Sequence, residues 1–75
     1  VSYDVPAPGG RVRIRVYDVA GRLVSTLVDG ERPAGRHGVT WSGQSQRGGP
    51  VASGVYFVKM TARNFGATRK IVLLK

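Results

Sequence analysis

Residues 11–17 read RVRIRVY, an alternation of arginine with β-branched apolar residues that ends on a tyrosine. Successive side chains of a β-strand point to opposite faces, so Val12, Ile14 and Val16 share one face and the arginines share the other. In an α-helix, Val12 and Ile14 would lie about 200° apart and would form no common apolar stripe. The pattern therefore predicts a half-buried antiparallel strand whose outer face is basic.

The residues that follow predict a hairpin with an irregular return strand. Residues 18–21 read DVAG, where the aspartate can accept backbone hydrogen bonds and the glycine can adopt a positive φ. Residues 22–28 read RLVSTLV, which contains two leucines and two valines that a strict alternation cannot place on one face. We therefore expect a β-bulge in this strand.

The rest of the chain has the same pattern of short strands and turns. Further strands are expected at residues 1–5, 37–41, 55–62 and 67–74. Loops or turns are expected at residues 6–10, 29–35, 42–50 and 63–66. No segment has a sustained helical period. The sequence thus predicts an all-β fold, a small immunoglobulin-like antiparallel β-sandwich of about six to seven strands, formed by residues 1–75 as one domain.

Length and composition limit how such a domain is stabilised. A chain of 75 residues buries only about 60% of the surface that its unfolded form exposes, so the core is thin. The chain has no cysteine, which excludes a disulfide framework. Its longest apolar run, residues 71–74, is too short to cross a bilayer, so no transmembrane segment is expected. Residues 1–4 lack the features of a signal peptide, and we expect a fragment of a longer protein.

No set of residues in the sequence predicts catalysis or a cofactor. His37 is the single histidine, no Gly-x-Ser-x-Gly elbow is present, and a thin sandwich offers little room for a catalytic pocket. One histidine without cysteine cannot supply a zinc site. Asp29 and Glu31 are the only acids close together in the sequence, which is too few ligands for calcium. We expect a non-enzymatic domain with no metal and no cofactor.

The net charge of +8 is the one extreme of composition, and it favours anionic partners. The candidate face for such a partner consists of Arg11, Arg13 and Arg15. The face becomes a patch if neighbouring strands add Lys59, Arg63 or Arg69. Tyr17 and Phe57 could supply the aromatic stacking that nucleic acid requires. The plainer interpretation is that the arginine stems cover the sheet and keep it soluble.

Trp41 has two interpretations. It lies in phase with His37 and Val39, which predicts a core residue whose indole N–H reaches a loop carbonyl. The alternative is a platform on which a sugar stacks. A lone tryptophan in a thin sandwich is usually its largest buried side chain, which favours the core.

Six segments, taken in order, resemble a known family. They are VYDVAGRLV (16–24), LVDG (27–30), PAGRH (33–37), VTW (39–41), GPVASGVYF (49–57) and RKIVLLK (69–75). The series resembles the type A C-terminal sorting domain of type IX secretion cargo. It is equally similar to the Ig-like domain of the flagellar hook-capping protein, the FlgD-like family. The resemblance covers about residues 3–75.

The sorting resemblance implies the C-terminal module of a larger secreted bacterial protein, which itself could be an enzyme. It implies recognition by a secretion translocon or receptor, and attachment to anionic lipopolysaccharide. The protein would then be secreted or held at the outer cell surface, which it would reach through the periplasm. The residues that the resemblance assigns to recognition are those of the last strand: Lys70, Ile71, Val72, Leu73, Leu74 and Lys75.

Two other functions stay open. One is a FlgD-like structural spacer or assembly domain. The other is an accessory module that binds an anionic polysaccharide through the arginine face. Because the resemblance points to secreted proteins, an acidic glycan or lipopolysaccharide ranks above nucleic acid as the partner.

The chain departs from the family at two places. Many hook-cap-like members carry aspartates after the tryptophan, where this chain has Ser42, Gln44 and Gln46. Family members also often begin with a further strand. Its absence would leave an open edge strand through which the fragment could self-associate.

Overall fold

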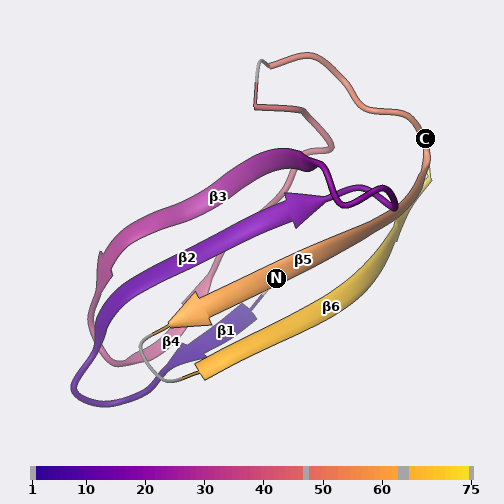
Figure 1. The fold of residues 1–75 in the computed structure, drawn as a ribbon. Coiled ribbons are helices and arrows are strands. Elements are labelled where there is room, and N and C mark those ends of the chain that lie inside the picture. The colour runs from indigo at the N-terminus through magenta and orange to yellow at the C-terminus, as the bar shows by residue number, and fades with distance from the viewer. Residues whose placement is uncertain (1, 47, 63–64, 75) are drawn as a thin grey trace.

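The computed structural model describes residues 2–46, 48–62 and 65–74, which form an all-β fold without a helix that could span a bilayer (Figure 1). These residues contain six strands in two antiparallel sheets. The strands are β1 (Ser2–Val5), β2 (Gly10–Tyr17), β3 (Leu23–Arg32), β4 (Gly35–Gly38), β5 (Gly54–Ala62) and β6 (Phe65–Leu73). The predicted all-β sandwich of about six to seven strands is confirmed.

The larger sheet has the strand order β3-β2-β5-β6, which places the arginine-rich strand β2 in its interior. β2 and β3 form one hairpin, β5 and β6 form another, and the ladder between β2 and β5 joins them. Val12, Ile14 and Val16 of β2 are 0%, 1% and 0% exposed. The prediction of a half-buried strand with a basic outer face is confirmed.

The smaller sheet consists of β1 and β4 and lies behind the larger sheet in Figure 1. Tyr3 and Val5 of β1 are buried, and they belong to the same apolar cluster as Ile14, Val58 and Met60 of the larger sheet. Every second residue of β1 therefore faces the core, and the same alternation of buried and more exposed side chains occurs along β2 and β5. One core of apolar side chains holds the two sheets together.

The predicted bulge is present, and it occurs twice. Ile14 lies opposite Val28 and Arg15 opposite Thr26, so Leu27 has no partner on β2. A second shift follows between Val16 and Tyr17 and leaves Val24 unpaired in the same way. Both extra residues are half-buried against the core. The bulges thus allow β3 to keep Val24, Leu27 and Val28 in contact with the core despite the broken alternation, whereas Leu23 is exposed.

The hairpin turn after β2 forms as expected. The Asp18 carboxylate Oδ1 accepts hydrogen bonds from the backbone N–H of Ala20 and of Arg22, each at 2.9 Å. Gly21 has a φ of 82° and donates its N–H to the Asp18 carbonyl oxygen at 3.0 Å. An aspartate at the start of the turn and a glycine at its end therefore determine the geometry of the turn.

Three predicted boundaries were wrong. Residues 29–32 belong to β3, so the expected loop 29–35 shrinks to residues 33–34, because Asp29 and Glu31 pair with Arg13 and Arg11 of β2. β4 ends at Gly38, and residues 39–41 are not a strand. β6 begins at Phe65, which was expected in a turn. Residues 63 and 64 of that turn lie outside the described residues.

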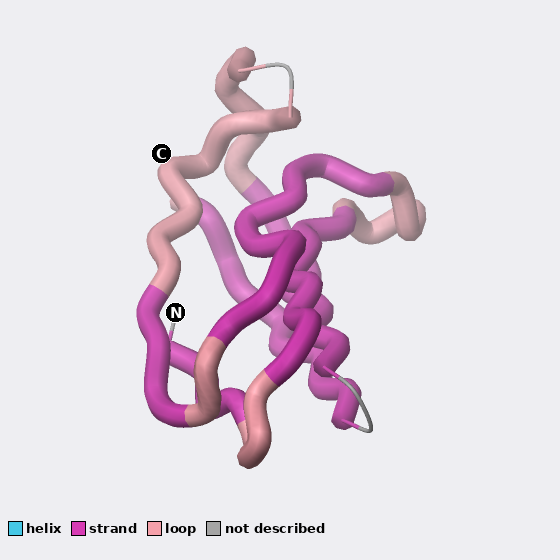
Figure 2. The backbone as a smooth tube through the Cα atoms, turned by 90° about the vertical axis from the view of Figure 1, so that its left-hand side faces the viewer, coloured by secondary structure: helices cyan, strands magenta, loops and turns pink. Residues whose placement is uncertain are grey.

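The connection from β4 to β5 projects beyond one end of the sheets (Figure 2). Its described residues are irregular, as expected, apart from an isolated bridge between Gln44 and Pro50. Trp41 anchors it: the indole N–H donates to the Gln44 carbonyl oxygen at 2.9 Å, and the ring meets Tyr56 edge to face at 5.1 Å. The core interpretation of Trp41 holds in part, since the residue is half-buried against the core.

The larger sheet ends in two open edges, β3 and β6. The side of β6 that faces the smaller sheet is only partly covered. Ile71 and Leu73 pack against the core, whereas Ala67 and Arg69 on the same side are exposed. The two-stranded sheet therefore does not reach across the whole of the four-stranded one.

Candidate interaction surfaces

His37 has a structural role. Its Nε2 lies 2.8 Å from the Pro33 carbonyl oxygen, an acceptor, which makes Nε2 the donor. Its ring stacks on Tyr3 with centroids 5.4 Å apart. Among residues 2–46, 48–62 and 65–74, no three histidine, cysteine or acidic side chains gather as a metal site would require.

The carboxyl group of Asp18 has a pKa that its hydrogen bonds lower. The backbone N–H of Arg22 holds the pKa of Asp18 below its ordinary value, with further contributions from the N–H of Ala20 and the guanidinium of Arg22. Arg22 Nε also donates to Asp18 Oδ2 at 3.1 Å. All these partners belong to the hairpin itself, so the shift reflects turn formation rather than a reactive site.

The three predicted arginines share the outer face of the four-stranded sheet, but they differ in their partners. Arg11 contacts the Asp29 carboxylate at 2.7 Å, and Arg13 lies 3.7 Å from the same oxygen. Arg15 has no ion pair within the described part of the chain, and it lies directly opposite Lys59 of β5. The predicted arginine face thus has two parts. Arg11 and Arg13 lie near the carboxylate of Asp29, whereas Arg15 has no carboxylate partner among the described residues.

The predicted extension of this face can be followed for Lys59 and Arg69, and it is correct for Lys59. Lys59 joins the arginines, and a hollow of about 170 Å³ lies among the residues Arg13, Arg15, Tyr17, Lys59 and Thr61. Arg69 lies opposite Val58, on the inner side of the sheet, and takes no part in the patch. Arg63 lies outside the described residues. Lys59 could be found from the sequence because it lies two residues after Phe57 in the same strand, and residues two apart in a strand share a face.

The predicted recognition strand divides between two faces. Ile71 and Leu73 point inward and are half-buried, whereas Lys70 and Val72 belong to the outer face and are exposed. Leu74, directly after β6, is 84% exposed. Lys75 lies outside the described residues. Of the five described residues of the predicted set, three are thus available to a partner while the domain is folded: Lys70, Val72 and Leu74.

Comparison with known proteins identifies the family. The family model of the FlgD Ig-like domain matches residues 1–66. The chain belongs to the FlgD Ig-like domain family. Two curated relatives, the basal-body rod modification proteins FlgD of Salmonella typhimurium and Salmonella typhi, are each 38% identical over 63 residues. The match covers 84% of this chain and 27% of each relative, so the chain spans about a quarter of their length. No solved structure matches.

Of the two families that the sequence resembles, the FlgD Ig-like domain is therefore the one shown. As a FlgD Ig-like domain, the chain is a non-catalytic module.

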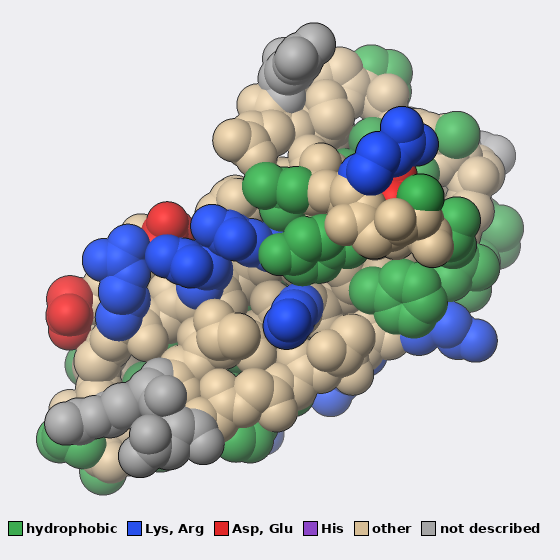
Figure 3. Space-filling view, viewed as in Figure 1, with side chains coloured by type: hydrophobic (Ala, Val, Ile, Leu, Met, Phe, Trp, Pro, Cys, Tyr) green, Lys and Arg blue, Asp and Glu red, His purple; other side chains and the backbone are tan. Residues whose placement is uncertain are grey.

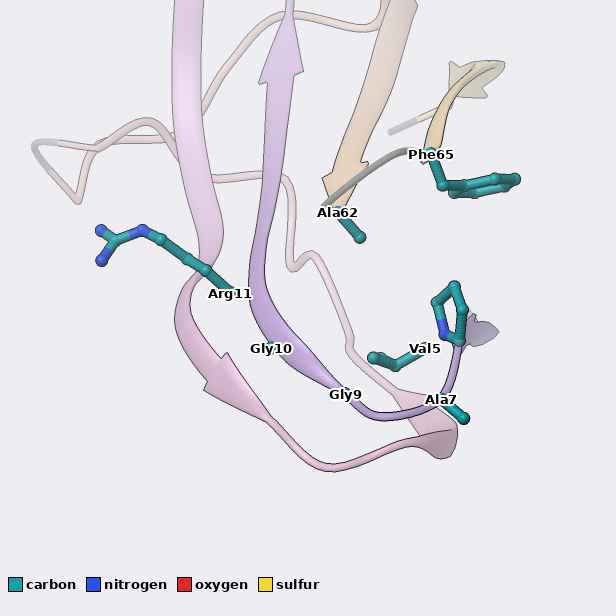
Figure 4. Close-up of a pocket in the computed structure, with 8 residues that line it drawn as sticks. Val5, Ala7, Gly9, Gly10, Arg11, Ala62 and Phe65 are labelled. Atoms are coloured by element: carbon teal, nitrogen blue, oxygen red, sulfur yellow. The ribbon is translucent and has the colours of Figure 1, made fainter.

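An apolar hollow of about 310 Å³ lies at the end of this FlgD Ig-like domain, between the start of β2, the end of β5 and the start of β6 (Figure 4). Val5, Ala7, Ala62 and Phe65 line it, and the side chain of Arg11 points away from it. It therefore contains no group for acid–base chemistry. Sequence reasoning missed this hollow because Phe65 was assigned to a turn.

Proposed function

We propose that this domain is an assembly module that holds a neighbouring protein segment by strand addition at β6. The observation that carries the proposal is the open edge of β6. An edge strand presents unpaired backbone N–H and C=O groups, which an extended segment can satisfy. The inner side of β6 also leaves Ala67 and Arg69 without a covering strand.

A groove beside β6 supports this mode of docking. It has a volume of about 140 Å³ and is lined by Ser2 and Tyr3 of β1, by Ile14, Val58 and Met60 of the core, and by Ala67, Thr68 and Arg69 of β6. The groove therefore runs between the free edge of β1 and the uncovered side of β6. An added strand could place an apolar side chain in it and thereby extend the core.

The names of the relatives suggest the setting. They are called basal-body rod modification proteins. In line with the resemblance of the sequence to modules of secreted proteins, we propose that the parent protein is secreted or held at the outer cell surface, which it reaches through the periplasm. Its partner would be a protein component of an extracellular assembly.

Secretion sorting is the second candidate. It is favoured by the exposure of Val72 and Leu74, at 60% and 84%, at the end of β6. A translocon could bind these side chains without unfolding the domain. Deletion of residues 70–75 would be a poor test, because it also removes Ile71 and Leu73 from the core.

Single-cysteine labelling tests the assembly function, since the chain has no cysteine of its own. Ala67→Cys reports on the uncovered side of β6, and Val19→Cys, in the exposed hairpin turn, is the control. We expect maleimide to label both in the isolated domain, but to label Val19→Cys alone in the assembled parent protein. Equal labelling of the two in the assembly would contradict strand addition at β6.

A reporter fusion separates sorting from assembly. The domain is fused to the C-terminus of a reporter enzyme in a bacterium with a type IX system, and the reporter in the medium is measured. Sorting requires that Val72→Asp together with Leu74→Asp abolish export while the domain stays folded. Export that is unchanged by these substitutions leaves assembly as the function.

A further inference from the structure

The outer face of the four-stranded sheet carries an apolar cluster that is only partly buried. Tyr17 and Phe57 lie directly opposite each other on β2 and β5, and Leu23 extends the row on β3. Val55 and Val72 form the next cross-strand pair. Leu23 is 44% exposed and Val72 60%. We call these five residues the apolar cluster: Leu23, Tyr17, Phe57, Val55 and Val72.

Three cations border this cluster without a carboxylate partner. Arg15 lies opposite Lys59, and Lys70 lies opposite Phe57. None of the three has an ion pair within residues 2–46, 48–62 and 65–74. The Nε of Arg15 is shielded from solvent and has no hydrogen-bond partner there. Like charges directly opposite each other destabilise a sheet, so this arrangement is a cost to the isolated domain.

Figure 3 shows both parts of this surface on one side of the molecule, with cations gathered over one half and apolar side chains over the other. The row that contains Arg15 and Lys59 and the row that contains Tyr17 and Phe57 are two residues apart along their strands. That separation is about 7 Å. A partner that fits both rows presents a carboxylate and an apolar side chain at this spacing.

We propose that this face binds a protein surface or segment on which acidic and apolar side chains alternate. The inference rests on the assembly function and deepens it by giving the chemistry of the partner. Aromatic residues and arginine concentrate at the centres of protein interfaces, which matches Tyr17, Phe57 and Arg15. The carboxylates of the partner would satisfy Arg15 and Lys59, and its apolar side chains would cover the apolar cluster.

Other occupants fit this face less well. A polyanionic glycan or a nucleic acid would use the cations and the aromatic rings but would leave Leu23, Val55 and Val72 in water. A second copy of the chain carries the same charge of +8 and is repelled. An acidic protein segment uses both parts of the surface.

The test uses a capped peptide of three Glu-Ser-Leu-Ser repeats, which in extended form places glutamate and leucine on one face about 7 Å apart. Binding is followed by NMR on the isotopically labelled chain. We expect the signals of Tyr17, Phe57 and Lys70 to shift. Arg15→Gln combined with Lys59→Gln is expected to weaken binding about five- to tenfold, through the loss of two exposed ion pairs. Val72→Ser tests the apolar part and should weaken binding as well.

Arg36→Gln is the matched control, since it removes one exposed cation from β4 in the other sheet. It should leave the affinity of the peptide unchanged. The proposal is overturned if the Arg15 and Lys59 variant behaves like this control, or if a peptide with glutamine in place of glutamate binds equally well. It is also overturned if polygalacturonate or a thymidine oligonucleotide binds this face at least as tightly at the same salt concentration. Protection of Ala67→Cys in the assembled parent is independent of all these results, so the assembly function can stand if this inference fails.

Discussion

Any residue larger than glycine at position 9 would require the surrounding backbone to move. Gly9 has a φ of 91°, and a Cβ built on it would lie 2.8 Å from the Arg32 carbonyl oxygen and 2.9 Å from the backbone nitrogen of Ala34. Gly48 has nearly the same φ, 89°, but its Cβ would have no neighbour within 4 Å. The two glycines therefore separate the cost of a positive φ from the cost of a steric clash.

We expect Gly48→Ala to lower the free energy of unfolding by about 1 kcal/mol, the cost of a left-handed conformation. Gly9→Ala should lower it by at least about 1 kcal/mol more, because backbone atoms on β3 and after it have to shift. Urea denaturation of both variants measures the difference. Equal losses in the free energy of unfolding would show that the backbone around Gly9 can shift at little cost.

Val12 and Val72 form a second matched pair, with exposures of 0% and 60%. Val12→Ala leaves a cavity in the core and should reduce the free energy of unfolding by about 2 kcal/mol. Val72→Ala should change it by less than about 0.5 kcal/mol, as is usual for a surface position. Denaturation in urea distinguishes them, and a large loss at Val72 would mean that the outer face is packed.

Asp18 gives a pH dependence whose sign follows from its hydrogen bonds. Because its pKa is lower in the folded state than in the unfolded state, its contribution to stability is present above about pH 4. The contribution is lost as the pH falls through the folded pKa. We expect Asp18→Asn to flatten the decline in melting temperature below about pH 4, relative to the wild type. Parallel declines in the two proteins would rule out this role.

At the scale of elements, the start of β5 is tied to the preceding connection. The Tyr56 hydroxyl donates to the Ala52 carbonyl oxygen at 2.6 Å, and the Tyr56 ring contacts Trp41. The Gln46 N–H donates to the Val24 carbonyl oxygen at 2.7 Å, which ties the same connection to β3. The projecting loop is thus attached to the sheets at both of its flanks.

Tyr56→Phe removes one partly buried hydrogen bond and should cost about 1 kcal/mol of stability. Tyr17→Phe removes a hydroxyl from the outer face and should cost less. The fluorescence of Trp41, the single tryptophan, reports on both the unfolding and the loop. A Tyr56→Phe protein as stable as Tyr17→Phe would show that the loop carbonyl is equally well satisfied by water.

The sequence predicted correctly those elements that are determined by residues close together in the chain. Alternation identified β2 and β5, and the aspartate and the glycine of the first hairpin identified its turn. The end of β3 was missed because polar residues there are held by partners far along the chain: Asp29 by Arg11 and Arg13. Alternation alone predicts that the side chains of the last strand point to two faces. How exposed its inward side chains are depends on how much of the larger sheet the smaller sheet covers. That coverage is a property of the whole fold and not of the strand.

At the scale of the whole molecule, size and charge act together. The molecule measures 38 × 20 × 18 Å, so much of its surface is close to the core, and it carries a net charge of +8. Repulsion among the cations opposes the compact state, and salt screens it. The described ion pairs are exposed and contribute little.

We therefore expect the melting temperature to rise when sodium chloride is increased from about 0.01 to 0.15 M, where the Debye length falls from about 30 to 8 Å. Arg15→Gln combined with Lys59→Gln should reduce this rise, because it removes two opposed cations. Calorimetry measures both effects. A melting temperature that falls with salt would show that the attractive pairs outweigh the repulsion.

The ladder between β2 and β5 also has a kinetic consequence. It joins residues 12–17 to residues 57–62, so the two hairpins must meet across some forty intervening residues before the central pairing exists. Such non-local topology slows folding, and sandwiches of this kind fold in milliseconds to seconds. β1 pairs with β4 alone, over four residues, and can join only a surface that the hairpins have already built. By the same reasoning, β1 is the first strand to detach from the native protein, and its amide protons should exchange with solvent sooner than those of β2.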